Sequence, residues 1–256
     1  MTQRSERDVI SGIESIAKFY ITPSLFNPSK TGDDEMSLNE SLPQTNIPAG
    51  TPHYWVKAKQ ILSETDPVLA KVIQRFEQGD DPPLNSRGDL FYTLANAIVG
   101  QQISAAAAAA VWGRLSHLWE QEVTAERVLN SSDQTLRDLG LSKRKVEYLK
   151  GVAESMTSLQ SFPWLDMTDR EVIDTLCSLR GVGPWTAEMT LIFTLLRPDV
   201  LPLGDIGVIR AVERLYANGD SLSASEVELI AERWRPYRTV AVWYLWRTID
   251  SEPVAY

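Results

Sequence analysis

The segment LRGVGPWTA, residues 179–187, constrains the fold of this 256-residue chain more than any other feature. It separates two amphipathic runs, and two glycines that flank one valine let the backbone reverse sharply and approach an outside group closely. The second run opens with free N–H groups and the positive end of a helix dipole at the turn. We therefore predict helix, tight turn, helix, in which the main-chain amides of Gly181, Val182 and Gly183 can cradle a phosphate. The alternative is an ordinary helix connection with glycine C-caps.

Apolar residues recur at three- and four-residue spacing through the rest of the chain beyond residue 50, as at Leu90, Leu94 and Ile98. Besides helices around 90–98 and 111–118, this spacing predicts helices over 53–63, 66–77, 125–130, 133–138, 143–159, 169–179, 185–196, 205–216, 224–232 and 237–249. Capping residues precede many of them, namely Asp66, Thr124, Ser132, Ser142, Thr168 and Ser223. No segment alternates as a strand does, so we predict an all-α fold. The six alanines of 105–110 predict a helix that neighbouring helices approach closely.

Composition divides the chain near residue 52. The stretch 27–52 is rich in Ser, Thr, Asn, Pro and acidic residues and has no apolar periodicity. We therefore expect residues 1–52 to form a polar, partly disordered lead and residues 53–256 to form the helical domain. The net charge is −9, of which four basic and seven acidic side chains in residues 1–50 account for −3. Binding to nucleic acid would thus depend on local geometry rather than on bulk charge.

Several classes of site are excluded by residue counts. The single cysteine, Cys177, rules out an intramolecular disulfide, a four-cysteine iron–sulfur cluster and a multi-cysteine zinc site, and there are only two histidines. We expect no metal or organic cofactor. Apolar stretches fall short of the roughly 20 residues that span a bilayer, and the polar start lacks a signal-peptide pattern. The sequence predicts a soluble intracellular protein without a membrane partner, in the cytoplasm or nucleoid of a bacterium or the nucleus of a eukaryote.

A second motif, LPLGDIGVIRA, follows at residues 201–211, and in it Asp205 stands between two glycines at the start of a helical run. The ordinary role of an aspartate at this position is to cap the helix. The same position can also present a carboxylate at the mouth of a cleft, with its charge held by helix amides. Such a carboxylate suits the stabilisation of a cationic intermediate.

Two more segments complete a pattern of four motifs: LANAIVGQQIS at 94–104 and RPYRTVAVWYLWR at 235–247. In this order and spacing they resemble the helix-hairpin-helix (HhH-GPD) DNA glycosylases, and within them the alkylpurine branch, DNA-3-methyladenine glycosylase II. The resemblance covers about residues 53–249. It implies a helical bundle of two lobes with an active-site cleft between them, and it makes Asp205 the catalytic aspartate.

The resemblance also assigns the hairpin and its neighbours to DNA. It implies that Gly181, Val182 and Gly183 grip the backbone through main-chain amides, and we place Thr186 with them. The lyase-competent branches carry a lysine two residues after the second hairpin glycine, where this chain has Trp185. Without an amine to attack the sugar, the nucleophile is water and the enzyme is monofunctional.

The target base must leave the stacked duplex to be cleaved. By family position Gln102 is the side chain that fills the gap, although a polar residue in a helix connection is the alternative. The resemblance places Trp185 and Trp246 at the base pocket, with Tyr237 as a weaker candidate, because electron-rich rings hold a cationic purine well. The other tryptophans are expected in the core.

Basic residues gather at 143–145, where Lys143 and Arg144 open a helix and could contact phosphate. A solvated helix start is the equally open alternative. Carbonyl groups of the turn at 181–183 could hold a monovalent cation beside a phosphate. The expected partner is double-stranded DNA with alkylated bases, and the expected state is a monomer.

N-alkylation at N3 or N7 puts a positive charge on a purine, so the base leaves without a general acid. The leading hypothesis is therefore a monofunctional DNA glycosylase that excises 3-methyladenine and 7-methylguanine and so initiates base excision repair. One alternative is a glycosylase for deaminated or etheno purines on the same scaffold. Another is a non-catalytic DNA-binding module, against which Asp205 argues, because a grip on phosphate needs no carboxylate.

Overall fold

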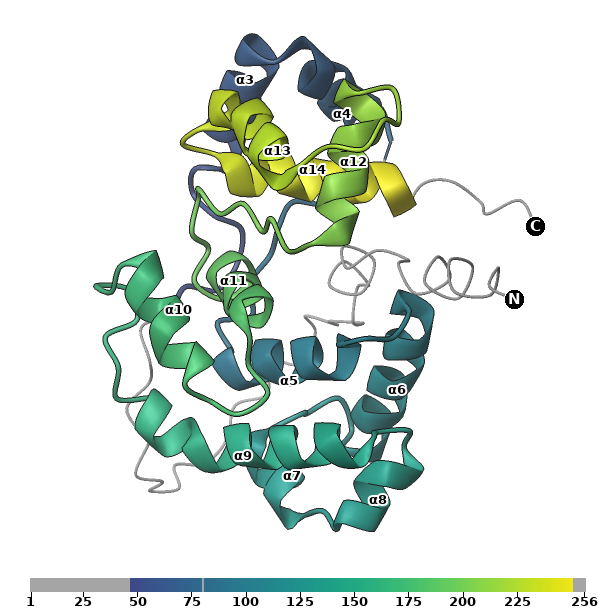
Figure 1. The fold of residues 1–256 in the computed structure, drawn as a ribbon. Coiled ribbons are helices and arrows are strands. Elements are labelled where there is room, and N and C mark those ends of the chain that lie inside the picture. Colours follow the sequence, from purple (N-terminus) through teal and green to yellow (C-terminus); the bar gives the residue numbers. More distant parts are fainter. Residues whose placement is uncertain (1–46, 80, 251–256) are drawn as a thin grey trace, which may run out of the picture.

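The computed structural model describes residues 47–79 and 81–250, and helices dominate these ranges (Figure 1). The helices are α3 Trp55–Thr65, α4 Pro67–Glu77, α5 Leu90–Gly100, α6 Ala105–Leu118, α7 Ala125–Asn130, α8 Asp133–Asp138, α9 Lys143–Leu159, α10 Asp169–Cys177, α11 Pro184–Phe193, α12 Ile206–Tyr216, α13 Ala224–Ala231, the 3-10 helix η1 Glu232–Trp234, and α14 Arg238–Asp250. Within the described residues the only β-type pairing is an isolated bridge between Gly50 and Ser86. The all-α prediction is confirmed.

Figure 1 shows the helices in two groups. We call α3, α4, α12, α13, η1 and α14 the terminal lobe, since the chain enters it first and returns to it last. Here α3 packs on α4, and α14 packs on α12, α4 and α3. We call α5–α11 the central lobe, in which α9 packs on α5, α7 and α8, and α11 packs on α5 and α10. The hairpin between α10 and α11 thus belongs to the central lobe, whereas Asp205 begins α12 of the terminal lobe.

The predicted capping residues start their helices as expected. Ser142 and Thr168, for example, accept the N–H of the residue three positions on, and Thr168 forms a reciprocal capping box with Glu171. Asp66 does more than cap α4, because its fully buried carboxylate also accepts hydrogen bonds from Trp234 Nε1 and Tyr216 Oη, each at 2.8 Å. This carboxylate therefore ties the start of α4 to η1 and α12.

Two boundaries differ from the prediction by three residues or more. Helix α11 ends at Phe193 rather than at residue 196, because the Leu195 N–H donates to Thr190 O and Leu196 takes a positive φ of 53°. Residues 47–52 belong to the folded body, since the N–H and C=O of Gly50 both pair with Ser86. The rest of the predicted lead, residues 1–46, lies outside the described residues.

The alanine run forms the start of α6 as predicted, with Ser104 as its cap. The expected close packing on it is wrong. Ala108 is buried, whereas Ala106, Ala107, Ala109 and Ala110 are exposed. This part of α6 contacts the core along one narrow line only.

Candidate active site

Asp205 lies at the N-cap of α12, and its side chain is 2% exposed. Oδ1 accepts the N–H of Val208 at 3.0 Å, so the capping role is real. The same oxygen accepts a hydrogen bond from Trp246 Nε1 at 3.1 Å, and Oδ2 accepts one from Trp185 Nε1 at 2.8 Å. Three N–H donors from α12, α14 and α11 thus surround one buried carboxylate, which is the arrangement that stabilises its negative charge away from water.

Because Gly207 has no side chain, the Asp205 carboxylate and the Trp246 indole can lie this close to each other. A Cβ atom at this position would lie 3.0 Å from Asp205 Oδ1 and 3.4 Å from Trp246 Cδ1. Trp246 itself is 0% exposed, and its ring stacks on Phe193 with centroids 5.8 Å apart and planes 15° apart. Both faces of this indole are therefore within the protein. The structure assigns Trp246 to holding Asp205, and it does not leave a free face with which Trp246 could stack on a base.

Trp185 and Tyr237 are both half-buried, but they lie in different surroundings. Trp185 occupies the first turn of α11, directly after Pro184, and its partly exposed ring extends from the hairpin to Asp205. Tyr237 stacks on Tyr54 at a centroid distance of 6.0 Å, and no described contact joins it to Asp205. The structure thus brings Trp185 together with Asp205 and Trp246, and leaves Tyr237 apart.

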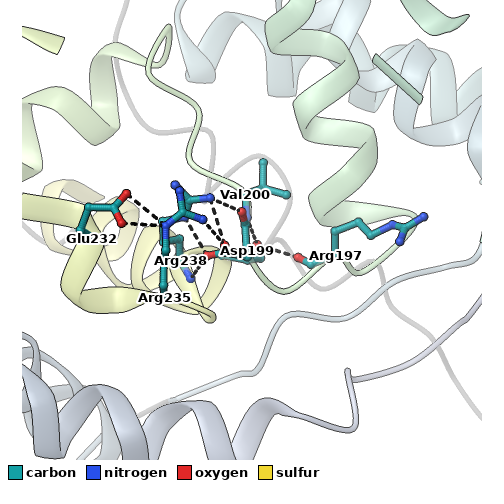
Figure 2. Close-up of polar contacts among 7 residues, drawn as sticks. Arg197, Asp199, Val200, Glu232, Arg235 and Arg238 are labelled. Atoms are coloured by element: carbon teal, nitrogen blue, oxygen red, sulfur yellow. Dashed lines mark hydrogen bonds and ion pairs between the residues drawn. The ribbon is translucent and has the colours of Figure 1, made fainter. Parts of the chain in front are cut away.

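The loop that leads to Asp205 is fixed on the first turn of α14 (Figure 2). Arg238 donates from Nε and Nη2 to the two carboxylate oxygens of Asp199 at 2.7 and 3.0 Å. Thr239 Oγ1 accepts the N–H of Val200 at 3.0 Å and donates to Arg197 O at 2.6 Å. Because α14 also carries Trp246, one helix fixes both the loop before Asp205 and a donor to its carboxylate.

The hairpin reverses at Gly181, which has a φ of 92°. The ring of Tyr148 covers this residue so closely that a Cβ would lie 2.2 Å from the ring. The Val182 N–H already donates to Leu179 O at 3.1 Å, so the predicted phosphate contact through this amide needs correction. The N–H groups of Gly181 and Gly183 have no partner among the described residues, and they are the hairpin donors left for an anion.

Thr186 also differs from the expectation. Its side chain is 1% exposed, and Oγ1 accepts Gln101 Nε2 at 3.2 Å. The hydroxyl therefore faces inward and does not reach DNA. Only its backbone N–H, in the first turn of α11, remains as a donor toward the hairpin.

Two basic side chains lie close to the ring of Tyr148, which covers Gly181 of the hairpin. Arg144 donates from Nη2 to Tyr148 Oη at 2.9 Å, and the guanidinium carbons of Arg144 and Arg180 lie 5.8 and 5.9 Å from the ring centroid. Lys143 and Arg144 are both exposed at the start of α9. Local positive charge therefore lies beside the free amides of the turn in a chain that is acidic overall.

Gln102 lies two residues after the end of α5 and is exposed. Its φ of 59° places a side-chain-bearing residue in the left-handed region, which costs energy and is seen at functional sites. The structure thus presents this glutamine at a bend between α5 and α6.

Sequence reasoning missed Glu188. This half-buried residue lies one turn after Trp185 on α11, and it accepts no hydrogen bond from the described part of the chain. Burial, together with the negative charge of Asp205, raises the pKa of Glu188 to about 7. The available signal was a charged residue among the otherwise uncharged residues of α11, PWTAEMTLIF, three positions after Trp185.

Over 47–79 and 81–250, no group of three or more His, Cys, Asp or Glu side chains could hold a metal ion, and no helix is long and apolar enough to cross a bilayer. At the hairpin, the carbonyls of Leu179 and Gly181 each accept an internal hydrogen bond. A second lone pair on each remains for a cation.

Comparison with known proteins agrees with this geometry. Residues 95–236 match the family described as HhH-GPD superfamily base excision DNA repair protein. A Bacillus subtilis protein named provisionally as a DNA-3-methyladenine glycosylase is 31% identical over 186 residues, which are 68% of this chain and 64% of the relative. The chain thus spans just under two thirds of that relative's length.

Two solved structures share the fold. The Schizosaccharomyces pombe 3-methyladenine DNA glycosylase in complex with abasic DNA has a TM-score of 0.67 and 29% identity, covering 75% of this chain and 96% of that one. The Bacillus halodurans DNA-3-methyladenine glycosidase has a TM-score of 0.61 and 34% identity, covering 79% and 92%. Since the matched region contains the hairpin, Asp205 and Trp185, the chain belongs to the HhH-GPD superfamily of base excision DNA repair proteins.

Proposed function

We propose that this protein is a monofunctional DNA glycosylase that excises N-alkylated purines, with 3-methyladenine and 7-methylguanine as its bases. The observation that carries this proposal is the carboxylate of Asp205, held by two indole N–H groups and one backbone amide at the start of α12. The relatives named DNA-3-methyladenine glycosylase support the same substrate class.

The chemistry follows from the charge of an alkylated purine. As the bond between C1′ and the purine nitrogen breaks, its electron pair neutralises the cationic base, and positive charge develops on the sugar. Asp205 stabilises that charge electrostatically in surroundings where water is scarce. A water oxygen then bonds to C1′ and its proton passes to the solvent, so that the products are the neutral free base and an abasic site.

The residue beside the hairpin decides between hydrolysis and lyase chemistry. Trp185 has no amine, and its indole N–H is committed to Asp205 Oδ2. Because no Schiff base can form there, the abasic strand stays intact until another agent cleaves it.

DNA would be held at the central lobe. The free N–H groups of Gly181 and Gly183 can contact phosphate, and Lys143 and Arg144 add local positive charge, whereas Arg180 is paired with Glu147. We propose that the protein acts as a monomer on double-stranded DNA. A monovalent cation bound by turn carbonyls would strengthen the same contact.

Glu188 favours one second candidate, a glycosylase for deaminated or etheno purines. Such bases are neutral and leave more readily when protonated. A carboxyl group with a pKa of about 7 beside Asp205 can hold a proton near neutral pH.

The test is to incubate the full chain with DNA carrying 7-methylguanine, with DNA carrying hypoxanthine and with undamaged DNA. Free base is measured first, and strand breaks are measured with and without alkali. We expect release of 7-methylguanine and breaks only after alkali treatment. Breaks without alkali would overturn the monofunctional assignment, and release of hypoxanthine alone would favour the second candidate. Binding without release of any base would leave a DNA-binding module.

A further inference from the structure

We propose that Gln101 is a positioning residue that sets the distance between the side chain inserted into the base stack, Gln102, and the hairpin that grips the strand. Gln101 Nε2 donates to Gly181 O at 2.9 Å and to Thr186 Oγ1 at 3.2 Å, across 80 and 85 residues of sequence. One side-chain amide therefore joins the end of α5 to both the turn and the first helical turn of the hairpin. This inference rests on the proposed function, because it takes Gln102 as the inserted residue.

The Gln101 side chain connects two segments that are themselves held in place, and the first of them is the end of α5. Gln101 is the C-cap of α5 and precedes Gln102, whose φ of 59° leaves it little freedom to move independently. On the other side, Lys145 Nζ donates to Val99 O at 2.7 Å, so α9 also holds the last turn of α5. The bend that presents Gln102 is thus fixed from α9 and from the hairpin.

The hairpin end of the connection is equally constrained. Gly181 is confined between the ring of Tyr148 at its Cα and the Gln101 amide at its carbonyl oxygen. Thr186, whose hydroxyl accepts the second Gln101 hydrogen bond, is buried. When a phosphate binds the free N–H groups of the turn, the separation between that phosphate and Gln102 is therefore fixed by the Gln101 side chain.

Insertion into a paired stack depends on this separation, whereas excision of an unpaired base does not. A lesion opposite its partner must be unpaired and its gap filled, at a cost of a few kcal/mol. A lesion without a partner is already extrahelical for much of the time. Loss of the connection should therefore impair excision selectively from paired DNA.

The variant that removes both donors and keeps the length of the side chain is Gln101→Met. We expect single-turnover excision of 7-methylguanine opposite cytosine to fall about ten-fold, which corresponds to about 1.4 kcal/mol. Excision of the same lesion opposite an abasic-site analogue should fall less than about two-fold. Gln60→Met is the matched control, because Gln60 is exposed on α3 and its side chain bonds to Glu64 alone among the described residues. This control should behave as the wild type on both substrates.

A double-mutant cycle tests whether Gln101 acts through its neighbour. If it does, Gln101→Met combined with Gln102→Ala should excise the paired lesion no more slowly than Gln102→Ala alone. Equal losses on paired and unpaired lesions, fully additive losses in the cycle, or no loss at all would each overturn the proposal. A wild-type chain that releases no alkylated purine from either DNA would instead overturn the proposed function, so the two failures are distinguishable.

Discussion

Trp246 Nε1 lies 3.1 Å from Asp205 Oδ1, although 41 residues separate them in the sequence. The pair joins the N-cap residue of α12 to the second half of α14, within the terminal lobe. The ring is buried completely, so its contribution to the site is one N–H group aimed at the carboxylate. Substitutions that change this one group while keeping the packing are therefore informative.

Asp205→Asn should abolish most excision and retain the fold. The amide cannot supply the negative charge that stabilises the sugar cation, so single-turnover excision should fall by at least about 100-fold. Its NH₂ group also cannot accept one of the two indole N–H groups, which should cost about 1–3 kcal/mol of stability. Excision of 7-methylguanine, binding to abasic DNA and urea unfolding measure the three effects.

Asp66→Asn is the matched control for this variant, since Asp66 is also a buried N-cap that accepts an indole N–H. It should lower the free energy of unfolding similarly and leave excision intact well below the unfolding temperature. Near-wild-type excision by Asp205→Asn would remove the proposed mechanism.

Trp246→Phe removes the N–H donor and preserves an aromatic ring against Phe193. Because one hydrogen bond to a charged group is lost, we expect excision to fall about ten-fold. Trp243→Phe provides the comparison, because Trp243 is equally buried on α14 and its Nε1 has no partner among the described residues. Stopped-flow or quenched-flow measurements of the excision rates of both variants test this prediction. Equal rates would show that the Trp246 N–H does not matter.

Gly207→Ala should displace the Asp205 carboxylate without changing its charge. The added methyl group would lie 3.0 Å from Asp205 Oδ1, so the side chain or the Trp246 ring must shift. We expect a loss of excision of about ten-fold or more, since small misplacements in a catalytic group are costly. Gly151→Ala, in the middle of α9 with no atom within 4 Å of the new methyl group, should be neutral or slightly stabilising. A Gly207→Ala enzyme with full activity would contradict the role of close approach at this site.

Glu188 makes stability depend on pH in a defined direction. Its pKa is about 7 in the folded protein against an ordinary value of 4.5, so the folded state binds the extra proton between these values. The stabilisation is complete below pH 4.5 and is lost as the pH rises through 7. Glu188→Gln should therefore match the wild type in urea unfolding at pH 4.5 and exceed it at pH 8.

Glu226→Gln should show the opposite trend. Hydrogen bonds from the Ser223 side chain and backbone lower the pKa of Glu226, so its contribution is present at neutral pH and is lost in acid. This variant should be less stable than the wild type at pH 8 and should approach it at low pH. If Glu188→Gln followed the same trend as Glu226→Gln, that result would contradict the half-buried position of Glu188 beside the charge of Asp205.

Local signals in the sequence predicted much of this structure. The apolar spacing gave helix positions to within a few residues, and Asp66, Ser142 and Thr168 cap helices because a short polar side chain before a periodic run does so regardless of the rest of the fold. The same local signal predicts Asp205 as a cap, since its motif begins a helix. Its catalytic role and the place of Trp185 at the site follow from the resemblance of the motifs to those of the family.

Long-range features were not predictable in this way. Whether Trp246 offers a ring face or an N–H depends on Phe193 and Gly207, which lie far from it in the sequence. Thr186 was expected to face DNA, but its hydroxyl meets Gln101 because α11 packs on α5. The alanine run is exposed because no helix among residues 47–79 and 81–250 covers most of it. Each of these three features depends on which helices pack against each other. The spacing of apolar residues along one helix does not specify its partner helix.

Asp205 takes one indole N–H from each lobe, Trp185 from the central lobe and Trp246 from the terminal lobe. The carboxylate is therefore a link between the two lobes, which the described residues connect through loops. A twist of one lobe against the other would change the geometry of these two hydrogen bonds. We therefore expect variation in the contacts between α11 and the loop before α12 to alter the electrostatic field at Asp205 while every residue in contact with the carboxylate stays the same.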